Sequence, residues 1–210
     1  MRKKTTDHLQ QDRAIQTRKH LMDAARRILA RDGFEVARLQ DIAAEAGKTR
    51  GAFYAHFADK EDLFFALFEE YIARDQERYS QMKSDAPLEK RIAKLVDQLE
   101  SILRDRDRVL LFLEFKMYAI RHPHKTRRLA HLHADMCVRG SSHKLTTFPE
   151  LLIQHPGKRR KAFWIFSATF DGLAMQLYFD PEGTNKTELR RKLEQLIRDQ
   201  IEIVKQINAT

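Results

Sequence analysis

The sequence contains few of the residues that cross-link a chain or interrupt its helices. A single cysteine, Cys137, occurs among 210 residues, which excludes an internal disulfide framework and suits a reducing compartment. Seven glycines and five prolines leave few positions for turns, so long helices are expected. No uncharged apolar run approaches the roughly 20 residues of a membrane span, and residues 1–13 lack the apolar stretch of a signal peptide. We therefore expect a cytoplasmic protein with no membrane partner.

Positive charge exceeds negative charge, and the excess is concentrated near the N-terminus. Lys and Arg total 39 against 30 Asp and Glu, which gives a formal net charge of +9. Residues 1–60 alone carry 13 basic and 8 acidic side chains. This distribution favours a polyanionic partner and indicates a basic N-terminal module on a larger, nearly balanced body.

The apolar residues follow helical spacing along almost the whole chain. Leu21, Ala24, Ala25, Ile28 and Leu29, for example, recur at the intervals of one helix face. The pattern predicts an all-α protein of about nine helices, and no segment alternates in the manner of a strand. We expect a mobile basic arm over residues 1–16, a first domain over 17–60 and a larger domain over 61–210.

Residues 39–54 contain the segment with the clearest chemistry. Two short helices are expected to meet at Gly47, the second spanning roughly Thr49 to His56, as in a helix-turn-helix whose second helix enters the major groove of DNA. Its first turn then presents Lys48, Thr49 and Arg50, and an arginine can pair with guanine O6 and N7. A surface helical hairpin without a DNA partner is the alternative that spacing and charge leave open.

Residues 17–68 resemble the DNA-binding region of the TetR family of bacterial transcriptional regulators. The residues that carry the resemblance are Ala24-Ala25, Gly33-Phe34, Asp41-Ile42-Ala43, Ala46-Gly47, Gly51 with Phe53-Tyr54, His56-Phe57 and Lys60-Glu61-Asp62-Leu63-Phe64. Phe170-Asp171-Gly172-Leu173-Ala174, followed by Asp180-Pro181, is similar to the penultimate helix of that family. The middle of the chain shows no matching motif.

The resemblance implies a homodimer in which residues 17–60 form a three-helix DNA-binding domain and residues 61–210 form a helical ligand-binding and dimerisation domain that holds an inducer. Such a repressor binds a palindromic double-stranded operator, which makes it nucleoid-associated, and leaves that operator when a small molecule binds. No cofactor is expected, and the chain is not expected to be an enzyme because no catalytic constellation appears. The expected DNA-binding residues are Thr17, Arg38, Gln40, Lys48, Thr49, Arg50, Gly51, Tyr54, His56 and Lys60.

Two positions depart from the family pattern. An apolar residue is usual where Lys48 stands, and Thr or Ser is usual where Arg38 stands. A missing hydroxyl at position 38 removes an N-cap for the second helix, a loss of roughly 0.5–2 kcal/mol. Lys48 adds a side chain that can reach a phosphate.

The C-terminal part of the chain contains two further candidate sites. The apolar helices near residues 162–179 and 187–208 are expected to form an isologous dimer interface through Trp164, Ala168, Gly172, Leu173, Leu193, Ile197 and Val204. A cavity for an apolar or aromatic inducer is expected among Phe112, Phe115, Tyr118, Phe166 and Phe170. Ordinary core packing is the alternative for these aromatic residues.

A histidine-rich stretch supports an alternative function as a metal-responsive repressor. The segment from His122 to Cys137 contains two His-x-His pairs, and residues four apart on a helix can supply two metal ligands. Lys125 and the neighbouring arginines favour a solvated face instead, since positive charge repels a cation. No metal-binding residue is therefore assigned.

Overall fold

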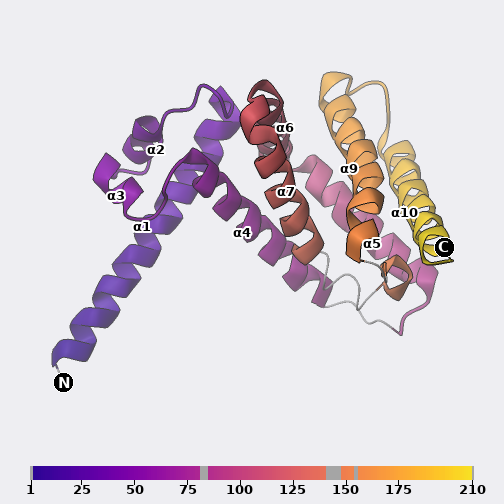
Figure 1. Ribbon diagram of the computed structural model, residues 1–210, viewed down its shortest axis with the longest axis horizontal. Coiled ribbons are helices and arrows are strands. Elements are labelled where there is room, and N and C mark those ends of the chain that lie inside the picture. Colours follow the sequence, from indigo (N-terminus) through magenta and orange to yellow (C-terminus); the bar gives the residue numbers. More distant parts are fainter. Residues whose placement is uncertain (1, 81–84, 141–147, 154–155, 210) are drawn as a thin grey trace. The chain divides into compact units, whose positions relative to one another are not determined.

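The computed structural model describes residues 2–80, 85–140, 148–153 and 156–209, and in these ranges it contains nine α-helices, one short 3-10 helix and no strand. The all-α prediction is confirmed. The helices, shown in Figure 1, are α1 (Arg2–Asp32), α2 (Leu39–Glu45), α3 (Arg50–Tyr54), α4 (Lys60–Ser80), α5 (Leu88–Arg104), α6 (Arg106–Arg121), α7 (Pro123–Gly140), η1 (Pro149–Leu151), α9 (Pro156–Phe179) and α10 (Lys186–Ala209). Within the described ranges, no helix combines the length and apolar character needed to cross a membrane.

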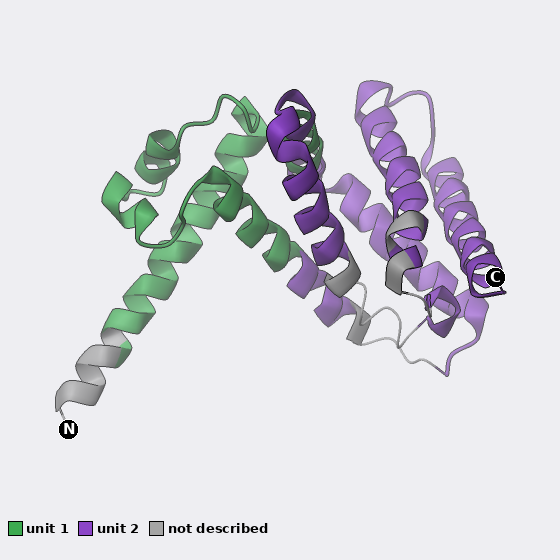
Figure 2. Cartoon of the chain, in the orientation of Figure 1, with its two compact units in different colours: residues 1–71, 110–118 green, residues 72–109, 119–210 purple. Residues whose placement is uncertain are grey.

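The chain divides into two compact units, which Figure 2 shows in different colours. Unit 1 comprises Met1–Tyr71 and Leu110–Tyr118, and unit 2 comprises Ile72–Val109 and Ala119–Thr210. The sequence placed a boundary between residues 60 and 61, whereas unit 1 also takes the first half of α4 and the middle of α6. Both additions supply aromatic rings to its core, which is why they group with it.

Stacked and edge-on aromatic rings form the centre of unit 1. Phe64 and Phe115 lie parallel with ring centroids 3.7 Å apart, and Phe34 meets them edge-on at 5.8 and 5.4 Å. All three side chains are at most 2% exposed. Their burial brings together the end of α1, the start of α4 and the middle of α6, with edge-on pairs contributing about 0.5–1.5 kcal/mol each beyond area.

The first helix begins earlier than the sequence indicated. Residues 2–16, expected as an arm ahead of the first helix, continue α1 without a break. Residues 10–16 are exposed, and the apolar face that packs inward begins at Leu21. Because hydrophobic patterning marks only the buried half of a helix, the exposed extension gave no helical signal.

Unit 2 is organised around α10, which packs on α5, α9 and η1. Its inward residues are buried and recur at helical spacing: Leu189, Leu193, Leu196, Ile197, Ile201 and Val204. Asp75 on α4 and Arg108 on α6 form a buried ion pair, with Nη2 of Arg108 2.7 Å from Oδ2 of Asp75. The 3-10 helix η1 precedes α9 along the chain and contains Pro149 in its first turn.

Candidate nucleic-acid interface

A glycine turn joins α2 to α3. Gly47 adopts the left-handed conformation, with φ of +64°, a geometry that residues with a Cβ rarely accept. Its N–H donates to Ala44 O at 2.9 Å, and the N–H of Lys48 donates to Ala43 O at 2.8 Å. These two bonds define a Schellman motif, so the turn that orients α3 is fixed by backbone chemistry at the end of α2.

Thr49 is the N-cap of α3. Its Oγ1 accepts a hydrogen bond from the N–H of Ala52 at 3.1 Å. The helix therefore begins at Arg50 and ends at Tyr54, shorter than the predicted span from Thr49 to His56. The cap commits one lone pair of the Thr49 hydroxyl to the helix start and leaves its proton available to a neighbouring acceptor.

The outer side of α3 carries Arg50 and Tyr54, both exposed to solvent. Nη2 of Arg50 donates to the Tyr54 hydroxyl at 3.2 Å, and the guanidinium carbon lies 5.5 Å from the centroid of the Tyr54 ring. Phe53 lies between them in the sequence and is fully buried. Burial of Phe53 therefore fixes which side of α3 is presented to a partner.

Two basic residues near this surface have other local roles. Arg38 occupies the N-cap position of α2 without a side-chain capping hydrogen bond, as its lack of a short-chain hydroxyl predicts. Lys60 donates from Nζ to Glu35 O at 3.1 Å and to Ala37 O at 3.0 Å. Lys60 thus ties the α1–α2 connection to the start of α4, in addition to any contact with a phosphate.

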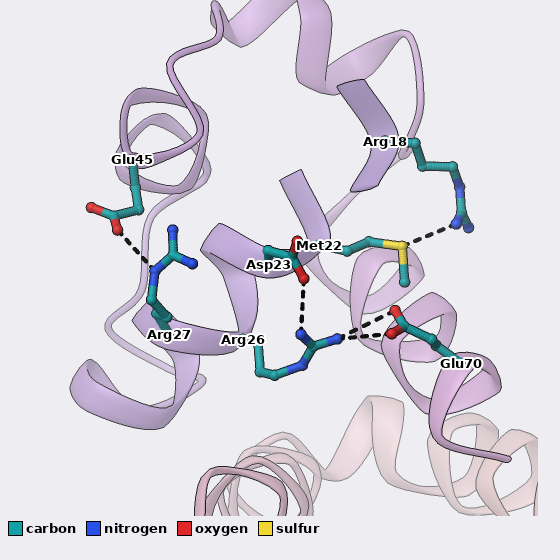
Figure 3. Close-up of polar contacts among 7 residues, drawn as sticks. All are labelled: Arg18, Met22, Asp23, Arg26, Arg27, Glu45 and Glu70. Carbon is teal, nitrogen blue, oxygen red and sulfur yellow. Dashed lines mark hydrogen bonds and ion pairs between the residues drawn. The ribbon is translucent and has the colours of Figure 1, made fainter. Parts of the chain in front are cut away.

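Polar contacts hold α1 against α2 and α4, as Figure 3 shows. Arg27 pairs with Glu45 on α2 at 3.0 Å, and Arg26 bridges Asp23 and Glu70 on α4 at 2.9 and 3.2 Å. Burial alone would lower the pKa of Arg26, but Tyr71, Glu70 and Asp23 raise it above its ordinary value. Sequence reasoning missed these ties because they join residues 18 and 44 positions apart.

The ten predicted DNA-binding residues all lie in unit 1, and none is buried. Arg38, Gln40, Thr49, Arg50, Gly51 and Tyr54 are exposed, while Thr17, Lys48, His56 and Lys60 are half-buried. Seven of the ten fall between Arg38 and Tyr54, on α2, α3 and the segments that flank them. Their DNA contacts stay a prediction, since the structure contains no nucleic acid.

The predicted inducer residues are distributed over both units. Phe112, Phe115 and Tyr118 belong to unit 1, and Phe115 and Tyr118 are buried there against Phe34. The Tyr118 hydroxyl donates to Oε1 of the buried Glu61 at 2.9 Å. Phe166 and Phe170 stack on each other within α9 at 6.0 Å. Phe115 and Tyr118 are thus buried in the core, as the alternative of ordinary core packing predicts. A pocket role for the five residues stays a prediction.

The predicted dimer residues also separate into two groups. Leu193, Ile197 and Val204 are 0–1% exposed within one chain, so they have no surface to offer a second copy and instead fill the core of unit 2. Trp164 is 70% exposed, Ala168 and Gly172 are exposed, and Leu173 is half-buried. The exposed group lies on α9, and its role in a dimer stays a prediction.

The histidine-rich segment does not assemble a metal site among the described residues. No group of three or more His, Cys, Asp or Glu side chains there is placed to hold an ion. The rings of His122 and His124 lie 5.9 Å apart, and Cys137 Sγ lies 3.9 Å from Nε2 of His133. Each contact involves two residues only, so nothing favours the metal-responsive alternative.

Comparison with known proteins identifies the N-terminal domain. Residues 21–67 match the family described as bacterial regulatory proteins, tetR family, and they span α2, α3 and the turn between them. The N-terminal domain belongs to the TetR family. The match also covers the end of α1 and the start of α4, and the chain shares its fold with solved TetR-family structures.

Individual relatives agree with this assignment. The chain is 40% identical over 70 residues to the HTH-type transcriptional repressor AcnR of Corynebacterium efficiens, which covers 33% of this chain and 37% of that repressor. Among solved structures, a member of the TetR family from Streptomyces coelicolor has a TM-score of 0.58 and 23% identity, covering 86% of this chain and 97% of that one. The regulator FadR of Bacillus subtilis, solved in complex with stearoyl-CoA, has a TM-score of 0.55 and 18% identity over 89% and 96%.

The sequence matches and the structural matches cover different shares of the chain. The chain spans about a third to a half of the length of the curated relatives it matches. The structural likeness covers most of the chain but shows the fold alone. The solved neighbours include FadR with stearoyl-CoA and a regulator from Saccharomonospora viridis with choline, the latter at a TM-score of 0.61 and 20% identity over 86% of this chain and 95% of that one.

Proposed function

We propose that the protein is a transcriptional regulator that represses by binding a palindromic operator as a homodimer and is released by a small apolar or aromatic inducer. The observation that carries this proposal is the α2–α3 pair, in which a glycine turn and a threonine cap present Arg50 and Tyr54 to solvent. That is the geometry by which a helix-turn-helix offers side chains to the major groove. The TetR-family match over this segment supports it.

An exposed apolar face on α9 supports the homodimer. Trp164, Met175 and Phe179 are 70%, 57% and 82% exposed, and they recur with Ala168 and Gly172 at intervals of three or four residues. Exposing such an apolar face to water is energetically unfavourable, and a face of this kind is typical of a protein interface. An isologous contact of α9 with its symmetry mate would cover this face and set two recognition helices on one palindrome.

The proposed inducer is apolar or aromatic because unit 2 is rich in apolar helical surface. FadR of Bacillus subtilis shares this fold and was solved with stearoyl-CoA, a ligand with a long apolar chain. Phe166 and Phe170 form a half-buried aromatic pair in unit 2 and are the favoured contacts for such a ligand. Phe112, Phe115 and Tyr118 belong to unit 1, and a ligand role for them stays a separate prediction.

Selection of DNA duplexes tests the proposal directly. The wild-type protein is used to enrich a random duplex pool, and fluorescence anisotropy then measures affinity for the enriched sequence and for its single-base variants. We expect an inverted repeat, and Arg50→Ala should cost about 1–3 kcal/mol and relax preference at one position of each half-site. Failure to enrich any sequence, or an Arg50→Ala protein with unchanged affinity, would contradict the proposal.

The same duplex identifies the releasing signal. Aromatic compounds, fatty acyl-CoA thioesters and Zn²⁺ are added in turn to the preformed complex, each over a concentration series. Release by an apolar compound is expected, and Phe170→Ala should shift that dose response while leaving DNA affinity unchanged. Release by Zn²⁺ alone would favour the metal-responsive alternative instead.

A further inference from the structure

Arg50 and Tyr54 form one unit on the exposed side of α3. Residues four apart on a helix share a face, and here the contact is specific: Nη2 of Arg50 lies 3.2 Å from the Tyr54 hydroxyl. The guanidinium carbon also lies 5.5 Å from the centre of the Tyr54 ring, within the range of a cation–π contact. The arginine is therefore held along α3 rather than extended freely into solvent.

The hydrogen-bonding capacity of the pair is only partly used. A guanidinium has five N–H donors, so one bond to Tyr54 leaves enough donors for a bidentate contact with guanine O6 and N7. The Tyr54 hydroxyl accepts from Arg50 and keeps its own proton, which can be donated to a phosphate oxygen. One side chain can thus connect a base-reading group to the DNA backbone.

The neighbours of Tyr54 keep its ring in place. Phe53 is fully buried and meets the Tyr54 ring edge-on at 5.7 Å, and Thr49 caps the start of the five-residue helix. Because the Tyr54 ring packs against a buried residue, its hydroxyl has a defined position on the exposed side of α3. The long and flexible Arg50 side chain is oriented by its contact with Tyr54, whose ring is already held in place.

We propose that Tyr54 is a positioning residue for sequence readout, which orients the Arg50 guanidinium toward a guanine edge while its hydroxyl donates to a phosphate. This inference rests on the proposed function, in that it assumes an operator read by α3. It goes beyond a list of separate DNA contacts because it makes the two residues energetically dependent on each other. A tyrosine that contacts phosphate alone would strengthen binding to all sequences alike.

A double-mutant cycle separates the two roles. Wild type, Arg50→Ala, Tyr54→Phe and the double variant are measured on the selected operator and on its single-base variants. Tyr54→Phe keeps the ring and removes only the hydroxyl. We expect it to reduce discrimination several-fold at the same base pair that Arg50→Ala affects, and to leave discrimination at that pair unchanged in the Arg50→Ala background, since coupled residues show non-additive effects.

Two controls exclude a general loss of structure. Tyr178→Phe removes a hydroxyl from unit 2, where it donates to Leu103 O at 2.7 Å, and it should leave every base preference unchanged. Arg50→Lys keeps the charge without the guanidinium fork, so it should retain the salt dependence of binding and lose discrimination. Thermal denaturation of the Arg50 and Tyr54 variants should match the wild type, because both side chains are exposed.

The outcomes distinguish this inference from the proposed function. If the wild type enriches an operator and Tyr54→Phe weakens all duplexes by the same factor, the positioning role is wrong and the proposed function stands. Multiplicative effects of the two substitutions at that base pair would overturn the positioning role in the same way. If the wild type enriches no sequence, the proposed function fails and the positioning role fails with it.

Discussion

Gly51 occupies the second position of α3, beside the two residues proposed to read DNA. A Cβ added there would meet only Oγ1 of Thr49, at 3.8 Å, which is an ordinary van der Waals distance. Nothing within the chain therefore requires a glycine at this position. The absence of a side chain is explained if the backbone of α3 approaches the DNA closely.

Gly51→Ala tests this explanation. Stability should rise by a few tenths to about 1 kcal/mol, because alanine is the better helix former, while affinity for the operator should fall about tenfold or more. Thermal denaturation and fluorescence anisotropy measure the two effects. A more stable variant with full affinity would show that the α3 backbone keeps its distance from the DNA.

Arg38 offers a second residue-scale prediction, since it sits at the N-cap of α2 without capping it. Arg38→Thr should raise the free energy of unfolding by about 0.5–2 kcal/mol, because a threonine hydroxyl can accept from an orphan N–H of the first turn. Urea denaturation measures the gain. Arg38→Ala is the matched control, which also removes the arginine but supplies no cap, so equal stability of the two variants would contradict the capping argument.

At the scale of elements, the end of α1 meets the middle of α6. Gly33 has φ of +81° and its N–H donates to Leu29 O at 3.1 Å. A Cβ at this position would lie 2.8 Å from Oε2 of Glu114 on α6. Gly33 therefore accommodates both a left-handed backbone conformation and the close approach of the Glu114 carboxylate.

Gly33→Ala should lower the free energy of unfolding by roughly the 1–2 kcal/mol that a left-handed alanine costs, because the contact is with the end of the flexible Glu114 side chain, which can move aside. In a chain that already carries Glu114→Ala, the same substitution should cost about the same. Urea denaturation of the wild type, the two single variants and the double variant gives the comparison. A clearly larger cost in the presence of Glu114 would show that its carboxylate is held in place.

The pair between α5 and η1 gives unit 2 an acid-sensitive contact. Arg91 lies 2.6 Å from Oε1 of Glu150 and 5.3 Å from the centre of the Phe148 ring. The hydrogen bond from Arg91 lowers the pKa of Glu150, although partial burial opposes the shift. A carboxyl with a lowered folded-state pKa stabilises the fold above the unfolded pKa of about 4.3, and that stabilisation is lost as the pH falls.

Glu150→Gln should therefore destabilise the protein at pH 7 and matter progressively less on acidification. A loss of about 2 kcal/mol at pH 7 is expected, below the roughly 3–5 kcal/mol of a fully buried pair, because the Glu150 side chain keeps a quarter of its surface exposed. Urea denaturation between pH 7 and pH 3 tests it. Parallel stability curves over that range would contradict a role for the Glu150 charge.

For the whole molecule, the proposed dimer uses the exposed face of α9. Gly172 has nothing within 4 Å of a Cβ built on it, so a larger side chain fits the single chain without strain. Gly172→Leu should leave thermal stability of the protomer nearly unchanged while disrupting the dimer and abolishing operator binding. Analytical ultracentrifugation at micromolar concentration and anisotropy are the measurements. A wild type that sediments as a monomer there would contradict the proposed mechanism.

Much of the helical framework follows from local sequence. Gly33 and Gly47 mark the ends of α1 and α2, and Asp59 caps the start of α4, with the N–H of Asp62 donating to Oδ1 of Asp59 at 2.8 Å. These signals are readable because a cap involves residues only a few positions apart. The 3.6-residue recurrence of apolar side chains likewise identifies the buried face of each helix before any packing is known.

The partners of the buried faces were decided by tertiary structure. Apolar spacing indicated that Leu193 and Phe115 lie on apolar helix faces. Such spacing does not identify the residues that pack against the face. The structure places Leu193 in the core of its own chain and Phe115 against Phe64 in unit 1. The Arg50–Tyr54 pair lay within reach of the sequence, since four-residue spacing on a helix implies one face. The sequence by itself thus determined that the chain is helical, where α1 and α2 end and which side of each helix is apolar, because those properties are local. Only the tertiary structure decided which faces meet, because burial is non-directional and any apolar face can cover another.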